Sequence, residues 1–170
     1  MQSFTQSSDA DVLDAANLWL ALVDFLPVDD PRMQGTITAI TEQLAGTNGL
    51  LYRYQPSETP TQDRQKAAHR QVTGTTDDGL PVSEGTFTAC TFWLSSVFCL
   101  ADKVDEAQAR FEHLLRYASP LGLFAEEIDP ETGRQRGNYP QAFTHLGLIN
   151  AALHLAEAQR KGAATTTHHR

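Results

Sequence analysis

Two adjacent carboxylates, Glu126 and Glu127, are the residues of this sequence best placed to do chemistry. They follow a short apolar segment and precede a turn, after which a strongly apolar helix is predicted from Pro140. Acidic side chains on a loop held at the entrance of a helix suit acid–base catalysis, because a rigid scaffold can aim them. A solvated acidic loop has the same residue types, since charged loop residues usually face water. The pair by itself therefore leaves both interpretations open.

Five helices are predicted to position this loop. Their expected ranges are 11–26, 31–44, 85–101, 104–118 and 140–158. Apolar residues cover nearly every side of the first, third and fifth, whereas the second and fourth each carry a single apolar stripe. Asp30 is the predicted N-cap of the second helix, with Pro31 at its first position. The only short strand candidate is 49–54.

The alternation between the two kinds of helix predicts two layers. A helix without a polar face must be buried on all sides, so the first, third and fifth helices are expected to form an inner layer wrapped by the other two. This is the arrangement of an all-α barrel built from inner and outer rings of helices. Three inner helices cannot close a ring, so we expect the chain to be part of a larger barrel or to pair with another chain.

Composition narrows the classes of function. The 170 residues indicate one domain, and the net charge of −8 disfavours nucleic acid and membrane as partners, because both require a basic surface. Cys90 and Cys99 fall in one predicted helix, about 13 Å apart along its axis, which is too far for a disulfide between them. Free buried thiols and the absence of a visible signal peptide favour a cytoplasmic location. We expect no cofactor and no metal.

Two segments are expected to lie outside the packed structure. The stretch at about 55–79 is rich in Thr, Gln, Pro, Asp and Ser and reads as a mobile insertion. The tail at 161–170 is expected to be disordered, and its two adjacent histidines make a poor metal site. The expected domain is therefore 1–160.

Several motifs together resemble glycoside hydrolase family 15, the family of glucoamylases, glucodextranases and some microbial trehalases. The stretches that carry the resemblance are 13–16, 25–32, 49–54, 84–94 and 137–145. The last reads Gly-Asn-Tyr-Pro-Gln-Ala-Phe-Thr-His, close to the family's usual Gly-Asn-Phe-Pro-Gln-Ala-Phe-Ser-His. The resemblance implies an (α/α)6 barrel, of which this chain corresponds to the C-terminal part.

The resemblance also implies a reaction, the inverting hydrolysis of a terminal α-glucosyl bond in α-glucans or trehalose. Such a reaction uses one carboxyl group to protonate the leaving oxygen and another to activate a water molecule. The family's base carries over to Glu126. Glu127 stands where many relatives have Gln and is expected either to contact sugar hydroxyls or to orient Glu126. The family's catalytic acid lies upstream of the matching region, so the chain is expected to hold the general-base half of the site.

Two further residues are candidate sugar contacts. Arg53 resembles a family arginine that contacts sugar hydroxyls, since its guanidinium offers a fork of donors beside the stacking faces of two tyrosines; a surface arginine is the alternative. Glu84 is expected either at the barrel mouth or as an ordinary acid in the first turn of a helix. Asp14 lies in an apolar segment, where a buried acid needs a partner.

A competing hypothesis is a non-catalytic helical module that binds a carbohydrate or pairs with another chain. The residues that would distinguish the two lie largely outside the chain.

Overall fold

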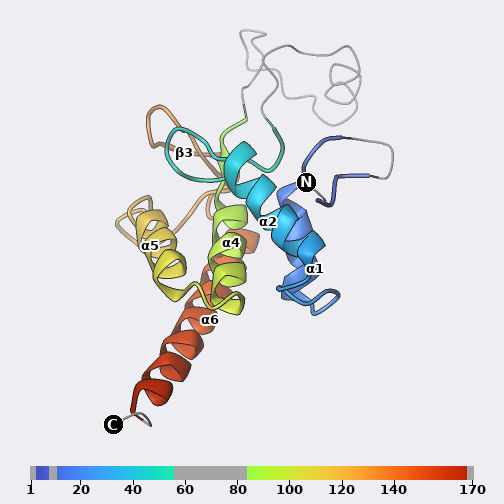
Figure 1. Cartoon of the computed structure of the whole chain (residues 1–170). Coiled ribbons are helices and arrows are strands. Elements are labelled where there is room, and N and C mark those ends of the chain that lie inside the picture. The colour runs from blue at the N-terminus through green and yellow to red at the C-terminus, as the bar shows by residue number, and fades with distance from the viewer. Residues whose placement is uncertain (1–2, 8–10, 56–83, 168–170) are drawn as a thin grey trace, which may run out of the picture.

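The fold is centred on one helix, α4 (Thr88–Leu100). The computed structural model describes residues 3–7, 11–55 and 84–167. Within them, α5 (Val104–Leu115) and α6 (Ala142–Thr167) pack against α4, as do η1 (Ala15–Leu18) and α1 (Trp19–Leu22). Figure 1 shows α6 running beside α4 and continuing past it toward the C-terminus.

The sequence of α4 explains its central place. It carries no charged residue, and its side chains are buried except for the half-buried Trp93 and the exposed Leu100. A helix with no polar face is stable in water only when it is surrounded. The prediction of an inner helix here is confirmed, although the helix begins three residues later than expected because residues 86–87 form a strand.

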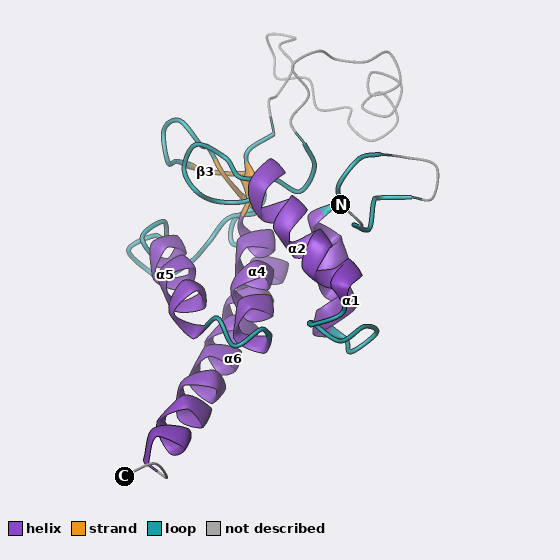
Figure 2. Ribbon diagram, in the orientation of Figure 1, coloured by secondary structure: helices purple, strands orange, loops and turns teal. Residues whose placement is uncertain are grey.

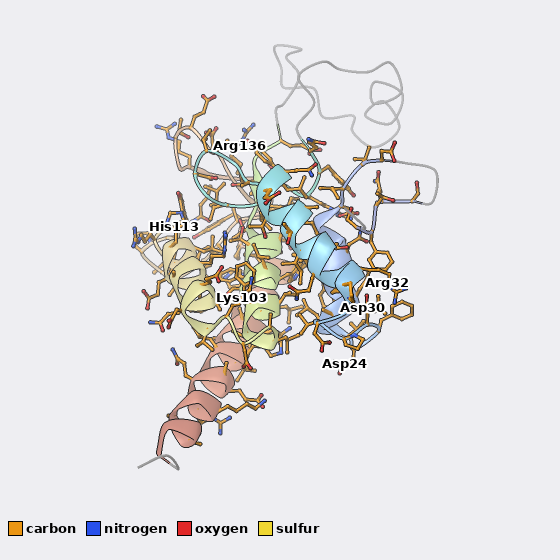
Figure 3. The ribbon with its side chains drawn as sticks, in the orientation of Figure 1. Asp24, Asp30, Arg32, Lys103, His113 and Arg136 are labelled. Carbon is orange, nitrogen blue, oxygen red and sulfur yellow. The ribbon has the colours of Figure 1, made fainter. Side chains whose placement is uncertain are left out.

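The outer helix α2 (Pro31–Gln43) agrees closely with its prediction. Asp30 caps it by accepting a hydrogen bond from the Arg32 backbone N–H at 2.9 Å, with Pro31 at the first helical position. The Arg32 side chain also reaches Asp30 at 2.7 Å, as Figure 3 shows at the start of the helix. These hydrogen bonds lower the pKa of the Asp30 carboxyl to about 2.

The predicted helix at 11–26 is wrong in its extent. Asp14 has an extended backbone, pairs with Tyr54 and caps η1 through its side chain, so the helical part begins only at Ala15. At the other end, Asp24 has a φ of +55°, which terminates the helix after α1. Long-range pairing at one end and a left-handed residue at the other therefore shorten a segment whose composition favours a helix.

The expectation that all three apolar helices are buried on every side is wrong for two of them. On α6 an apolar stripe is exposed, consisting of Phe143, Leu146, Ile149 and Leu153. On α1 and just after it, Trp19, Val23 and Phe25 are exposed, Phe25 at 71%. The described residues supply neighbours for only one face of each helix, so the opposite apolar face meets solvent.

A small sheet replaces the predicted strand at 49–54. It consists of β1 (Thr86–Phe87), β2 (Glu127–Ile128) and β3 (Gln135–Arg136), paired antiparallel in the order β1-β2-β3. The 49–54 stretch makes only the isolated bridges from Leu51 to Ala45 and from Tyr54 to Asp14. Figure 2 shows the strands at the N-terminal end of α4.

The C-terminal helix is longer than predicted. Helix α6 continues to Thr167, seven residues into the tail expected to be disordered, while 168–170 lie outside the described residues. Good helix formers such as Ala163 and Ala164 and an ion pair between Glu157 and Lys161 favour the extension. The expected insertion at 55–79 falls almost wholly on residues 56–83, which also lie outside the described part.

Both cysteines are free and buried, as expected. Within the described ranges, the structure contains no helix with enough length and apolar character to cross a membrane. The cytoplasmic location stays a prediction.

Candidate active site

The four predicted site residues come from three segments that meet at the N-terminal end of α4. The Phe87 N–H donates to the Leu51 carbonyl at 2.7 Å, which joins the segment carrying Arg53 to the one carrying Glu84. Strand β1 then pairs with β2, which brings Glu127 and its neighbour Glu126 alongside. Residues separated by up to 74 positions in the sequence (53 to 127) are therefore gathered at one end of the helices.

Glu126 is held by a clamp that consists of Gly137 and Asn138. Its Oε2 accepts hydrogen bonds from the Asn138 backbone N–H at 3.2 Å and from Asn138 Nδ2 at 2.9 Å. The Glu126 N–H in turn donates to the Asn138 carbonyl at 3.0 Å. Its other oxygen, Oε1, takes no hydrogen bond from the described residues, and the side chain is only half-buried. One carboxylate oxygen is thus fixed and the other is left open.

The backbone beneath Glu126 is anchored in the core. Phe124 on one side and Ile128 on the other are fully buried, and the Phe124 ring meets the Phe92 ring edge to face at 5.6 Å. The Glu126 carbonyl also accepts from the Thr88 N–H at 3.0 Å, which satisfies a free donor in the first turn of α4. The backbone that carries the Glu126 carboxylate is therefore held in place by its neighbours.

A glutamine completes the loop. Gln135 donates through Nε2 to the carbonyls of Tyr117 and Leu123 and accepts through Oε1 from the Ala125 N–H at 2.5 Å.

The turn that follows β2 is closed by Asp129, which also pairs with Arg136 at 3.5 Å. Figure 3 places Arg136 at this end of the molecule, away from the C-terminus.

Glu127 faces a different environment from Glu126. Its Oε2 accepts from the Gly85 N–H at 2.8 Å. Burial raises the pKa of the Glu127 carboxyl, and the negative charges of Glu84 and Glu126 add to the rise, while the Gly85 hydrogen bond and Arg136 oppose it. The two adjacent carboxylates are therefore bound to different segments and are not equivalent.

Arg53 and Glu84 are the more exposed residues at this end of the helices. Glu84 is exposed and directly precedes Gly85, the partner of Glu127. The Arg53 guanidinium is 5.0 Å from the Tyr54 ring centroid, and its Nε is 3.7 Å from Asp14 Oδ1, too far for a hydrogen bond. That Nε is buried without a hydrogen-bond partner among the described residues. Asp14 thus has the cationic neighbour that its position called for.

His145 bonds the backbone on both sides of its ring. Its Nδ1 contacts the Gln141 carbonyl at 2.7 Å, so this nitrogen carries the proton, and Nε2 accepts from the Phe124 N–H at 3.4 Å. Both ring nitrogens of His145 are therefore occupied by backbone groups.

Sequence reasoning missed Asn138, Gly137 and Gln135 as parts of the site. The signals for Gly137 and Asn138 were their place in the family motif at 137–145 and a Gly-Asn pair shortly before a proline, which indicates a turn. Neither signal says which carboxylate the turn contacts, because the contact spans twelve residues.

The arrangement suits proton abstraction from water. An ionised carboxylate with one oxygen held by N–H donors and the other open can accept a water proton through the open oxygen. Arg53, Glu84 and Glu127 lie on the segments that meet Glu126 at the N-terminal end of α4.

Comparison with known proteins identifies relatives of the chain. The chain is 45% identical over 157 residues to a trehalase of Mycolicibacterium smegmatis and 45% identical over 158 residues to a trehalase of Mycobacterium tuberculosis. A trehalase of Thermoplasma acidophilum is 35% identical over 156 residues. These alignments cover 92–93% of this chain but only 21–23% of the relatives, so the chain spans about a fifth of their length.

The fold comparison shows a shared architecture. The structure superposes on a bacterial glucoamylase crystallised with acarbose, with a TM-score of 0.67 at 16% identity, covering 87% of this chain and 21% of the glucoamylase. The prediction of an all-α chain that forms a portion of an (α/α)6 barrel is confirmed. The model of the glycosyl hydrolases family 15 matches residues 1–153. The chain therefore belongs to glycosyl hydrolase family 15.

Proposed function

We propose that this chain is the general-base portion of an inverting glycoside hydrolase that acts on trehalose. The observation that carries the proposal is the Glu126 carboxylate, with Oε2 bonded to Asn138 and with no hydrogen bond to Oε1 from the part of the chain that the structure describes. The names of the relatives at 45% identity favour trehalose over α-glucans as the substrate.

The proposed mechanism assigns Glu126 one proton transfer. A water molecule bound at Oε1 attacks the anomeric carbon as Glu126 removes its proton, and the bond from that carbon to the bridging oxygen breaks. A second carboxyl group, about 6.5–9.5 Å away, protonates the bridging oxygen. One glucose is released in the inverted β form and the other keeps its α configuration. We assign the acid to the part of the barrel that this chain does not contain.

We further propose that Arg53, Glu84 and Glu127 bind sugar hydroxyls. The Arg53 side chain is 41% exposed and its guanidinium lies 5.0 Å from the Tyr54 ring centroid, and Glu84 is an exposed acceptor. Substitution of these residues should raise KM more than it lowers kcat.

The exposed stripe of α6 supports the assignment of this chain as part of a larger barrel. Phe143, Leu146, Ile149 and Leu153 are each more than half exposed and follow helical spacing. A contiguous apolar stripe of this kind normally marks a contact surface. We propose that it packs against the helices that the longer relatives contain and this chain lacks.

The decisive experiment uses a trehalase hybrid, in which this chain replaces the matching 157-residue segment of the Mycolicibacterium smegmatis trehalase. We expect the hybrid to hydrolyse trehalose and the chain alone to be inactive. Proton NMR of the first turnover should show equal amounts of α- and β-glucose. Glu126→Gln in the hybrid should remove nearly all activity, since a general base contributes roughly 10²–10⁴-fold.

The matched control is Glu131→Gln, which neutralises an exposed acid in the same loop. It should leave the hybrid active. Retained activity in Glu126→Gln would show that Glu126 is not the base, and turnover by the chain alone would disprove the need for a separate acid.

A second candidate function is favoured by the same exposed stripe. The chain would then be a non-catalytic module that pairs with another chain through α6 or binds carbohydrate without hydrolysing it. An inactive hybrid, combined with calorimetric binding of trehalose to the chain alone, would support this alternative.

A further inference from the structure

The Gly137–Asn138 clamp contacts Glu126 from a segment to which no catalytic role is assigned. We infer that Asn138 is a positioning residue for Glu126, which orients one carboxylate oxygen so that the other faces the water molecule. This inference rests on the proposed function of Glu126 and adds the group through which that function would be controlled.

The hydrogen bonds of the clamp define the orientation of the Asn138 side chain. An ionised carboxylate has only acceptors, so Asn138 must present its Nδ2 and not its amide oxygen. Two donors from one residue converge on Oε2, at 2.9 Å from the side chain and 3.2 Å from the backbone. Hydrogen bonds to a charged group are the stronger kind, and two of them to one oxygen fix the rotation of the carboxylate plane.

The backbone next to Asn138 is shaped for the same contact. Gly137 has a φ of +73°, and a Cβ at that position would lie 3.0 Å from Glu126 Oε2 and 3.1 Å from Glu126 Cβ. The Glu126 side chain therefore lies directly on the Gly137 backbone. The Glu126 N–H bond to the Asn138 carbonyl closes the contact from the other direction.

Asn138 is exposed and its side chain makes no other hydrogen bond among the described residues. A residue that only stabilises a loop would be expected to bond backbone groups, as Gln135 does. Among the described residues, the sole partner of the Asn138 side-chain amide is the Glu126 carboxylate.

The test begins on the chain as it is. In ¹⁵N-labelled protein, the Asn138 Nδ2 resonances should shift strongly in Glu126→Gln, while those of Asn17, which donates to the Thr5 carbonyl at 3.1 Å, should stay in place. Unmoved Asn138 resonances would overturn the clamp regardless of any activity.

The kinetic arm uses the trehalase hybrid and compares two substitutions. Asn138→Ala removes the side-chain donor and should lower kcat by about 10²-fold with KM unchanged, since a small misplacement of a catalytic group has this cost. Asn138→Asp keeps the shape but places a second carboxylate against Glu126, and it should be slower still. A structural role predicts the opposite order, because the isosteric variant preserves packing better.

The controls separate this inference from the proposed function. Asn17→Ala removes an amide hydrogen bond of similar length away from Glu126 and should leave kcat unchanged. If Glu126→Gln is inactive but both Asn138 variants keep full kcat, the base assignment stands and the positioning role is refuted. The positioning role is also refuted if Asn138→Asp is faster than Asn138→Ala.

Discussion

Replacement of Gly137 by alanine tests the contact on which the site depends. Gly137 has a φ of +73°, a conformation that costs an ordinary residue about 1–2 kcal/mol. The new Cβ would also meet Glu126 Oε2 at 3.0 Å and Glu126 Cβ at 3.1 Å, well inside the usual contact distance. The carboxylate must then move away from Asn138 or the loop must shift.

Gly122 is a matched control for the backbone term. It has nearly the same φ, +74°, but nothing lies within 4 Å of the position its Cβ would take. Gly122→Ala should therefore show the conformational cost alone. Gly137→Ala should show that cost together with the steric term, which for crowding of this kind is about 1–3 kcal/mol.

The assay is urea unfolding of both variants, followed by circular dichroism at one protein concentration. We expect Gly137→Ala to be less stable than Gly122→Ala by at least about 1 kcal/mol. In the trehalase hybrid, only Gly137→Ala should lower kcat. Equal destabilisation by the two substitutions would mean that Glu126 does not rest on Gly137, and the account of the site would be wrong.

Three other predictions concern charge, core and surface. Burial raises the pKa of the Glu127 carboxyl in the folded state above its value in the unfolded chain. The folded state therefore binds this proton more tightly, and the resulting stabilisation is present at low pH and is lost as the pH rises through the folded-state pKa. Glu127→Gln cannot ionise and removes this pH dependence. The melting temperature of the variant minus that of the parent should therefore increase from pH 4 to pH 8, and a decrease would contradict a raised pKa at Glu127. Phe92→Ala empties a fully buried site between the rings of Phe111 and Phe124 and should cost about 3–5 kcal/mol in urea unfolding, whereas a cost below about 1 kcal/mol would show that the site is loosely packed. Ile149→Glu lies on the exposed stripe of α6 and should reduce self-association of the isolated chain in analytical ultracentrifugation without lowering its melting temperature; unchanged association would exclude the stripe as the contact surface.

The features that could be predicted from the sequence are those set by local chemistry. Asp30 caps α2 because an aspartate followed by a proline favours a helix start whatever surrounds it. Helix α4 is buried because a run without charge has no face suited to water. The motifs at 13–16, 25–32, 49–54, 84–94 and 137–145 indicated the family because they are specific in combination, and the family match over residues 1–153 confirms it.

The extent of the first helix depended on contacts that no local pattern contains. Asp14 pairs with Tyr54, forty residues away, and this pairing delays the helix to Ala15. The prediction of a strand at 49–54 was wrong for a related reason. This stretch pairs with other segments only through isolated bridges, and the sheet is formed by β1, β2 and β3. Short strands are determined by their partners, and the partners of β2 lie on two different segments.

The sequence by itself determined that Glu126 and Glu127 occur together between a short apolar segment and an apolar helix, whereas the loop expected for both is wrong for Glu127, which begins β2. Only the tertiary structure decided how they differ, with Glu126 bonded to Asn138 and Glu127 bonded to Gly85. The physical reason is the range of the interactions. Caps and apolar periodicity act within a few residues, whereas the orientation of a carboxylate depends on donors that the fold brings from 12 and 42 positions away.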